Sequence, residues 1–245
     1  MEKWWKLFWI IWSILLIALA IWYYYESEES DIIIGTSDSE ESGFTQLYWY
    51  PDSPNAIAWK ANYLLNWTHF DAEPDINSEH EAYIFWNFIA ERECDSIENI
   101  SNENYVTVSS TAYMYQDQSW VNENHTSYDE LLIHEQKHFD LTEVFARKLQ
   151  DRIENEIIPD KTSCRKIHSN FIIPPVIDKQ ILFLENEERK LLKRTQCLYD
   201  NKTDHNRNGT IQRDWYIMIE DWLEDGIDMD FLDEKYSIFT IMPKC

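Results

Sequence analysis

Three residues within one short segment have the types and spacing of a metal-binding catalytic helix. The segment Leu131–Asp140, LLIHEQKHFD, places His134, Glu135 and His138 in the order H-E-x-x-H. Positions four apart lie on one face of an α-helix, at about 100° per residue, so both imidazoles can bind one ion. Glu135 lies next to that face. The pattern is typical of zinc peptidases, in which such a carboxylate takes a proton from the water that zinc activates.

A zinc site with two histidines needs a further protein ligand. Extended metzincins continue the motif with a glycine and a third histidine, whereas this chain has Leu141 and Val144 at those positions. Asp140 and Glu143 face away from the two imidazoles on a regular helix. We therefore expect the third ligand from a distant segment.

The segment Tyr199–Trp215, YDNKTDHNRNGTIQRDW, is the expected source of that ligand. His205 is the candidate third zinc ligand, with Asp200 or Asp204 orienting an imidazole through a hydrogen bond. A calcium ion at residues 204–215 is an alternative, because D-x-N-x-N-G-x-I matches the early EF-hand positions, although tryptophan occupies the twelfth. A plain structural turn is the third interpretation.

The other histidines and two tyrosines have lesser expected roles. His125 lies just before the helix and is the reserve candidate for the third ligand. Tyr199 and Tyr128 are candidate donors to the oxyanion that peptide hydrolysis creates. The remaining histidines have no metal-ligand spacing, and we expect them on the surface or in loops: His69, His80 and His168.

The elements that must position these residues predict an α+β domain. Residues 81–91 and 105–115 are rich in aromatic and β-branched residues, which favours two strands paired antiparallel. A capping box at residues 127–130 begins the motif helix, which ends before Pro159. Residues 159–175 read as a loop, and further helices are expected at 178–197 and 211–223. We predict a small antiparallel sheet packed on the H-E-x-x-H helix and C-terminal helices, preceded by one transmembrane helix.

The N-terminal 43 residues predict export of the domain that follows. Residues 7–25 carry no charge, and a helix of this length, at ~1.5 Å per residue, is about long enough to cross a bilayer. Lys3 and Lys6 precede this run, so residues 1–25 are expected to anchor the chain with its N-terminus cytoplasmic and its domain periplasmic or extracellular. Cleavage of a signal peptide at an A-x-A pattern, giving a secreted domain, is the alternative. Residues 26–43 are acidic and serine-rich and predict a flexible tether, which leaves 44–245 as the folded domain.

Charge and cysteine content restrict the possible partners. The formal charge of −24, from 45 acidic and 21 basic residues, repels phosphate backbones and excludes nucleic-acid binding. The four cysteines form no C-x-x-C pair, so a cysteine zinc site is not expected. An exported domain favours two disulfides over four buried thiols, and all three pairings of the following residues remain open: Cys94, Cys164, Cys197 and Cys245.

Several blocks of the chain together resemble a bacterial family of predicted secreted zinc-dependent proteases, known as domain of unknown function 922. The blocks occur in order: LNWTHF at 65–70, SWV at 119–121, LLIHEQKHFDLTEVFARKL at 131–149, and YDNKTDHNRNGTIQRDW at 199–215. The H-E-Q-x-H-F-D core followed by E-x-x-A-R is the specific part. In the last block, Asn206 to Asn208 intervene between His205 and Gly209. The resemblance implies a zinc-dependent peptidase.

These observations predict a membrane-anchored, extracytoplasmic zinc peptidase that acts on peptide or protein substrates. His134, His138 and His205 would hold one Zn²⁺, and Glu135 would be the general base. The alternatives are an anchored, non-catalytic domain with a structural or vestigial metal site, and an acidic cell-surface interaction module with no metal.

Overall fold

The structure is a computed structural model of the chain, and it describes residues 55–78, 80–96, 104–126, 129–158, 162–167 and 170–236. The chain divides into two units, and every described residue lies in the second, which spans Trp49–Cys245. The expected anchor, the acidic tether, Tyr128 and His168 lie outside the described residues. Within the described part, no helix combines the length and the apolar character needed to cross a bilayer.

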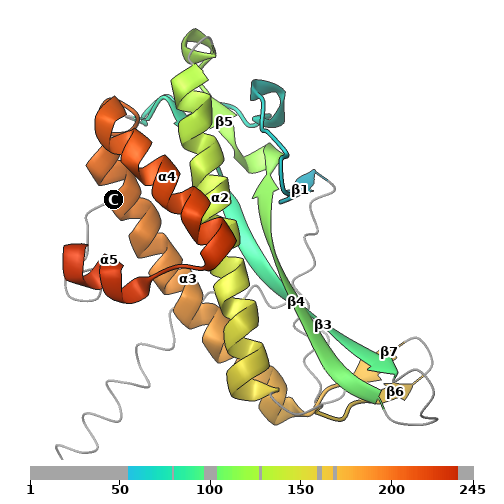
Figure 1. The fold of residues 1–245 in the computed structure, drawn as a ribbon. Helices are drawn as coiled ribbons and strands as arrows, with labels where there is room; N and C mark the ends of the chain where they lie inside the picture. Colours follow the sequence, from blue (N-terminus) through green and yellow to red (C-terminus); the bar gives the residue numbers. More distant parts are fainter. Residues whose placement is uncertain are drawn as a thin grey trace, which may run out of the picture. The chain divides into compact units, whose positions relative to one another are not determined.

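The main sheet is built on one long antiparallel hairpin (Figure 1). Strand β3 (Trp86–Ser96) pairs with β4 (Asn104–Tyr115), and the short β1 (Ala56–Ala58) pairs with the other edge of β4. Alternate residues of β4 are buried against the helices, with Val106, Val108 and Ala112 among them. This alternation is the period of a half-buried strand, and it confirms the expected antiparallel pairing.

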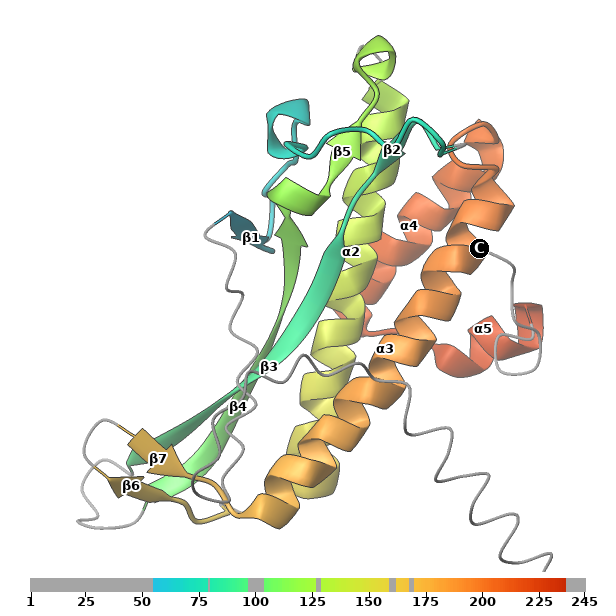
Figure 2. The ribbon, with the colours of Figure 1, turned by 180° about the vertical axis from the view of Figure 1, so that it is seen from behind.

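The expected first strand is divided in two. Strand β2 (Ala82–Tyr83) pairs antiparallel with β5 (Trp120–Val121) in a separate two-stranded sheet. The chain then turns so that the Phe85 backbone N–H donates to Ser119 Oγ at 2.9 Å, and β3 begins at Trp86. As a result β2 lies over the N-terminal half of the motif helix instead of continuing the long hairpin (Figure 2).

The motif helix is the central element of the molecule. Helix α2 (Asp129–Arg152) continues into a π-helical turn, η5 (Ile153–Ile157), and lies between the β3–β4 hairpin and the other helices (Figures 1 and 2). Phe139, Phe145 and Leu149 have no exposed surface. Because α2 is covered on more than one side, even charged residues on it are buried, which fixes the orientation of its polar face.

Helices α3 (Pro175–Thr203), α4 (Gly209–Asp225) and α5 (Met229–Tyr236) complete an α+β domain with small antiparallel sheets and four α-helices among the described residues. α3 is longer than the 178–197 expected from the sequence. It begins with Pro175 at its first position and ends at Asp204, whose left-handed backbone (φ 51°) closes the last turn. The added C-terminal turn matters because it makes Asp200 helical.

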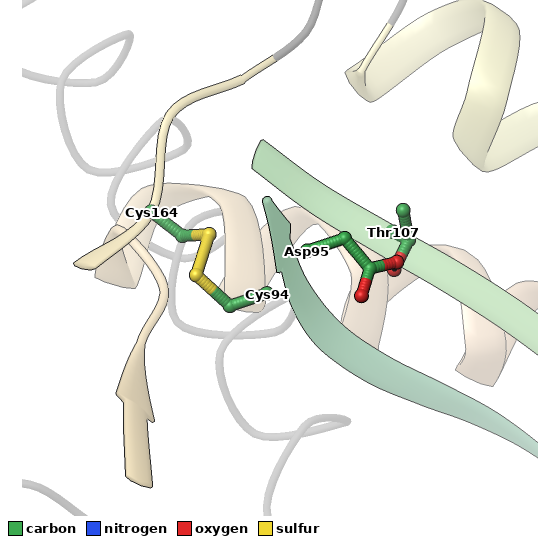
Figure 3. Close-up of a disulfide and its surroundings, with 4 residues drawn as sticks. All are labelled: Cys94, Asp95, Thr107 and Cys164. Atoms are coloured by element: carbon green, nitrogen blue, oxygen red, sulfur yellow. A yellow bond between two sulfur atoms is a disulfide. The ribbon is translucent and has the colours of Figure 1, made fainter. Parts of the chain in front are cut away.

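The segment expected as a loop between α2 and α3 contains a β-hairpin, which is a difference from the sequence prediction. β6 (Arg165–Ile167) pairs with β7 (Asn170–Ile172), and backbone hydrogen bonds join Thr162 and Cys164 to β4. A disulfide between Cys94 and Cys164 ties this segment to β3 (Figure 3). Cys197 is also disulfide-bonded, so the expectation of disulfides is confirmed for the described cysteines.

Candidate metal centre

Helix α2 brings the two histidines of the motif together. His134 and His138 are one helical turn apart, and their Nε2 atoms lie 3.1 Å from each other. Both side chains are almost fully buried, with exposed fractions of 2% and 6%. The shared orientation predicted from the i, i+4 spacing is therefore present.

Asp200, on the last turns of α3, supplies the third group of the cluster. Its Oδ1 lies 3.1 Å from His134 Nε2 and 2.8 Å from His138 Nε2. These three residues form the one group among the described residues whose ligand atoms converge closely enough to hold a metal ion. Burial alone would raise the pKa of Asp200, but the charges and hydrogen bonds of His138 and His134 hold it well below its ordinary value.

The spacing of the three atoms suits a small divalent ion. Tetrahedral zinc with bonds of 2.0–2.1 Å to nitrogen and oxygen keeps its ligand atoms about 3.3 Å apart. The three edges of 2.8–3.1 Å are slightly shorter than that. An ion would be accommodated by moving each side chain outward by a few tenths of an ångström, without any change in the helices.

A glutamine behind His138 determines which ring nitrogen faces the centre. Gln196 Nε2 donates to the backbone oxygen of His138 at 2.8 Å and to Thr142 Oγ1 at 3.2 Å. Because a backbone carbonyl can only accept, the amide orientation is fixed, and Gln196 Oε1 must face His138 Nδ1. Nδ1 therefore carries a hydrogen, and in the neutral ring Nε2 carries the lone pair.

That tautomer makes the donor set fit a cation. In the neutral ring the Nε2 lone pair of His138 would point at the Asp200 carboxylate from 2.8 Å, and two acceptors at that distance repel unless a proton or a cation lies between them. A proton would make His138 an imidazolium. Burial alone would lower the pKa of His138, but Asp200 and Glu135 raise it to about 9. A metal ion meets the same requirement.

His134 is held by stacking as well as by the helix. Its ring lies against the Tyr199 ring, with centroids 4.6 Å apart and planes 18° from parallel. Burial lowers the pKa of His134 to about 4, even though Asp200 acts in the opposite direction. The ring is therefore neutral near pH 7, which is the form that binds metals.

Glu135 lies beside the cluster without joining it. The side chain is 4% exposed, and burial raises its pKa to about 7, with the Asp200 charge acting in the same direction. His138 and a hydrogen bond from the Ile84 backbone lower that pKa. A carboxyl group whose pKa lies near neutrality can both take up and return a proton, as general acid–base chemistry requires.

The cluster opens into a cleft of about 590 Å³. α2 contributes His134, Glu135 and His138, the segment around β2 forms one side, and α3 forms the other. Tyr83 of β2 lines this cleft and stacks on Trp120, and part of the rise in its pKa comes from the Glu135 charge after burial. No sequence pattern predicts a role for Tyr83, because its position in the cleft depends on how β2 packs on α2.

His205, the expected third ligand, lies at the edge of the cluster. Its Nδ1 is 3.8 Å from Asp200 Oδ1, and its ring packs edge-on against His80 with centroids 4.7 Å apart. Asp204, His205 and Asn206 all have positive φ values, of 51°, 48° and 76°. Such a backbone is costly for residues other than glycine and persists only where surrounding contacts impose it. His80, expected as a surface residue, also lines the cleft.

The other sequence-predicted site residues are not among the three that converge on the centre. Asp204 is the left-handed residue that ends α3, and residues 209–215 belong to α4, so half of the expected calcium loop is helical. Tyr199 is fully buried behind His134, where its ring also contacts Trp215, and its pKa lies well above its ordinary value because of burial. His125 pairs with Glu81 at 3.1 Å.

We compared the chain with known protein families, curated proteins and solved structures, and none of the three comparisons found a match. The resemblance to the family of predicted secreted zinc-dependent proteases therefore stays a prediction from the sequence.

Proposed function

We propose that this protein is a zinc-dependent peptidase whose metal is held by His134, His138 and Asp200. The observation that carries the proposal is the geometry of His138, because Gln196 fixes a tautomer whose lone pair faces the Asp200 carboxylate at 2.8 Å. Two imidazoles and one carboxylate are a ligand set of catalytic zinc sites, which leave a fourth position open. Zinc is preferred over magnesium and calcium because imidazole suits it better than those oxygen-seeking ions.

In this proposal Asp200 takes the ligand position first expected for His205. Asp200 Oδ1 lies near both Nε2 atoms, whereas His205 approaches only the carboxylate, at 3.8 Å. His205 then faces the cleft beside the centre, where it is available to a substrate.

A bound zinc ion would lower the pKa of a water to near 7 and polarise the substrate carbonyl. Glu135 accepts a proton from the attacking water and returns it to the leaving amine, which its pKa of about 7 permits. Tyr83 is a candidate donor to the developing oxyanion, because it lines the cleft and its raised pKa keeps its hydroxyl protonated.

A peptide substrate is favoured by the strand next to the centre. β2 pairs with β5 on one side only, so among the described residues its other edge has no partner strand. An unpaired edge beside a catalytic cleft can bind an extended peptide through main-chain hydrogen bonds. Residues on both sides of β2 line the same cleft as Glu135.

Metal content and turnover together test the proposal. We expect the purified full-length chain to contain about one zinc per molecule and to cleave unstructured peptides, and Glu135→Gln to keep the zinc while its turnover falls by about 10²–10⁴-fold. Loss of zinc in His134→Ala is the matched control for binding. Full zinc occupancy without activity in the wild-type chain would favour a structural metal site, and absence of zinc would contradict the proposal altogether.

A further inference from the structure

The cleft beside the candidate metal centre contains two cationic side chains in a chain of charge −24. Arg207 lies just after the turn that carries His205, and its Nη2 is 3.7 Å from Glu81 Oε1. Lys193 lines the cleft from α3 and is exposed. No ion pair joins Lys193 to any residue that the structure describes. One of the two cations is thus already paired with a carboxylate, and the other is available.

The position of Lys193 on α3 sets its distance from the centre. It precedes Asp200 by seven residues, which is about two helical turns, or about 10 Å along the axis and on the same face. Gln196 lies between them on that face. An extended peptide advances about 3.3 Å per residue, so a peptide that ran along α3 from the centre would reach Lys193 about three residues from the bond at the centre.

We propose that Lys193 is a specificity-determining residue, which selects peptides that present a carboxylate about three residues from the cleaved bond. This inference rests on the proposed peptidase function. The carboxylate can belong to an Asp or Glu side chain or to the C-terminus of the peptide, because both offer the same oxygen acceptors to an ammonium group. The surrounding negative charge repels acidic peptides elsewhere on the molecule, so the preference is confined to this one position.

Peptide binding tests the inference without turnover. The protein is the full-length Glu135→Gln variant loaded with zinc, and the probes are C-terminally amidated peptides in which one Glu replaces Gln at successive positions. We expect one position at which Glu tightens binding by about 2–5-fold, the range of an exposed ion pair, and we expect that gain to shrink in high salt. Adding Lys193→Gln should abolish the gain, and Lys193→Glu should make Lys the preferred residue there.

Lys190→Gln is the matched control. It removes the same charge from the same helix, but Lys190 does not line the cleft, so the preference should persist. A parallel series of peptides with a free C-terminal carboxylate and no Glu distinguishes a side-chain carboxylate from the peptide C-terminus. If only that series binds more tightly, Lys193 recognises the C-terminus of the peptide. A preference that survives Lys193→Gln, or the absence of any preference for a carboxylate, would overturn the inference.

Failure of the inference can be told apart from failure of the proposed function. Wild-type protein that cleaves peptides with no preference for a carboxylate overturns the role of Lys193 alone. Peptides that bind with the Lys193-dependent preference but are never cleaved overturn the peptidase assignment alone. A zinc-loaded protein that binds none of the peptides overturns both.

Discussion

Gln196 does not contact Nε2 of His138, the nitrogen that faces the candidate metal centre. It contacts Nδ1 on the other side of the ring, and in this way it determines that Nε2 is the nitrogen available to a metal ion. Its amide is itself fixed by the His138 backbone oxygen and Thr142. Partners of this kind hold a metal-binding imidazole in one tautomer and one orientation, and their loss commonly weakens metal affinity by about 10–100-fold. The candidate metal site therefore depends as much on this buried amide as on the three ligands.

Gln196→Leu is expected to weaken zinc binding by about 10–100-fold while the fold is retained, because His138 then loses the acceptor that keeps its lone pair on Nε2. The measurement is a competition titration with a chelator of known affinity, with circular dichroism to confirm folding. Gln136→Leu is the control, since Gln136 is a buried glutamine of α2 that accepts from the Leu65 backbone N–H at 2.8 Å. Unchanged zinc affinity in folded Gln196→Leu would remove the tautomer argument.

Zinc binding is expected to release a proton. In the metal-free protein His138 has a pKa of about 9, and His134 is neutral because its pKa is about 4. Near pH 8 the incoming ion therefore displaces about one proton from His138, in addition to any proton lost by a water that the ion binds, and the His138 contribution declines as pH rises through 9. Calorimetry in two buffers of different ionisation enthalpy measures this number, and proton-independent binding at pH 8 would contradict the assigned state of His138.

The same raised pKa fixes how His138 affects the stability of the metal-free protein. A histidine whose pKa is higher in the folded chain stabilises the fold fully below its ordinary pKa of 6.5, and that contribution disappears as pH rises through about 9. Asp200 acts in the opposite direction, because its pKa is lowered: its contribution is present above its ordinary pKa of 3.8 and is lost on acidification.

At the scale of elements, the end of α3 is the feature on which the site depends. The helix continues to Thr203, so that Gln196 and Asp200 lie one turn apart on the face that meets α2. Asp204 then closes the helix with a left-handed backbone, and its N–H donates to the Asp200 backbone oxygen. The residue that ends α3 is thus hydrogen-bonded to the backbone of the candidate metal ligand Asp200.

Asp204→Gly is expected to stabilise the protein by about 0.5–1 kcal/mol, because glycine adopts the left-handed conformation (φ 51°) without steric cost. Asp204→Ala is the control, since it removes the same charge and keeps the strain. Urea unfolding measures both variants. Zinc affinity should stay unchanged in each, and a loss in both would instead assign Asp204 the role of orienting an imidazole.

The elements that the sequence predicts well are those defined by local patterns. The alternation in residues 105–115 and the apolar period of α2 each predict an element close to the observed β4 and α2. The hairpin β6–β7 could not be predicted in this way, because it depends on pairing with β4 and on the disulfide to Cys94. Non-local pairing of this kind leaves no periodic signal in so short a segment.

In the candidate site too, the residues defined by a local pattern could be predicted from the sequence, and those brought together by non-local packing could not. The pair of histidines and the adjacent Glu135 follow from spacing alone, since one helix carries all three. Asp200 is expected from the sequence only to orient an imidazole, because the predicted helix ends at residue 197, whereas α3 continues to Thr203. The i, i+4 spacing of Gln196 and Asp200 was the signal available. Tyr83 and Lys193 become part of the site only through the packing of β2 and α3 around α2.

For the whole molecule, the two ends of α2 are secured by different means. The helix has 24 residues and is about 36 Å long. Its N-terminal half carries the candidate metal ligands, while the Cys94–Cys164 disulfide lies at the far end of the β3–β4 hairpin, beside β6 and β7 (Figures 1 and 3). The metal cluster joins α2 to α3, and the disulfide joins β3 to the segment that precedes α3. The two links therefore constrain different parts of the chain.

This separation predicts that the disulfide supports stability and leaves the metal centre unaffected. The bridge joins residues 70 apart in sequence, so replacing both Cys94 and Cys164 with alanine is expected to lower the free energy of unfolding by about 2–5 kcal/mol, mainly because the unfolded chain gains freedom. The zinc affinity of the folded variant should equal that of the wild type. Urea unfolding of the metal-free protein and a separate zinc titration measure the two quantities. A folded variant that no longer binds zinc would show instead that the hairpin end and the metal end of α2 are coupled.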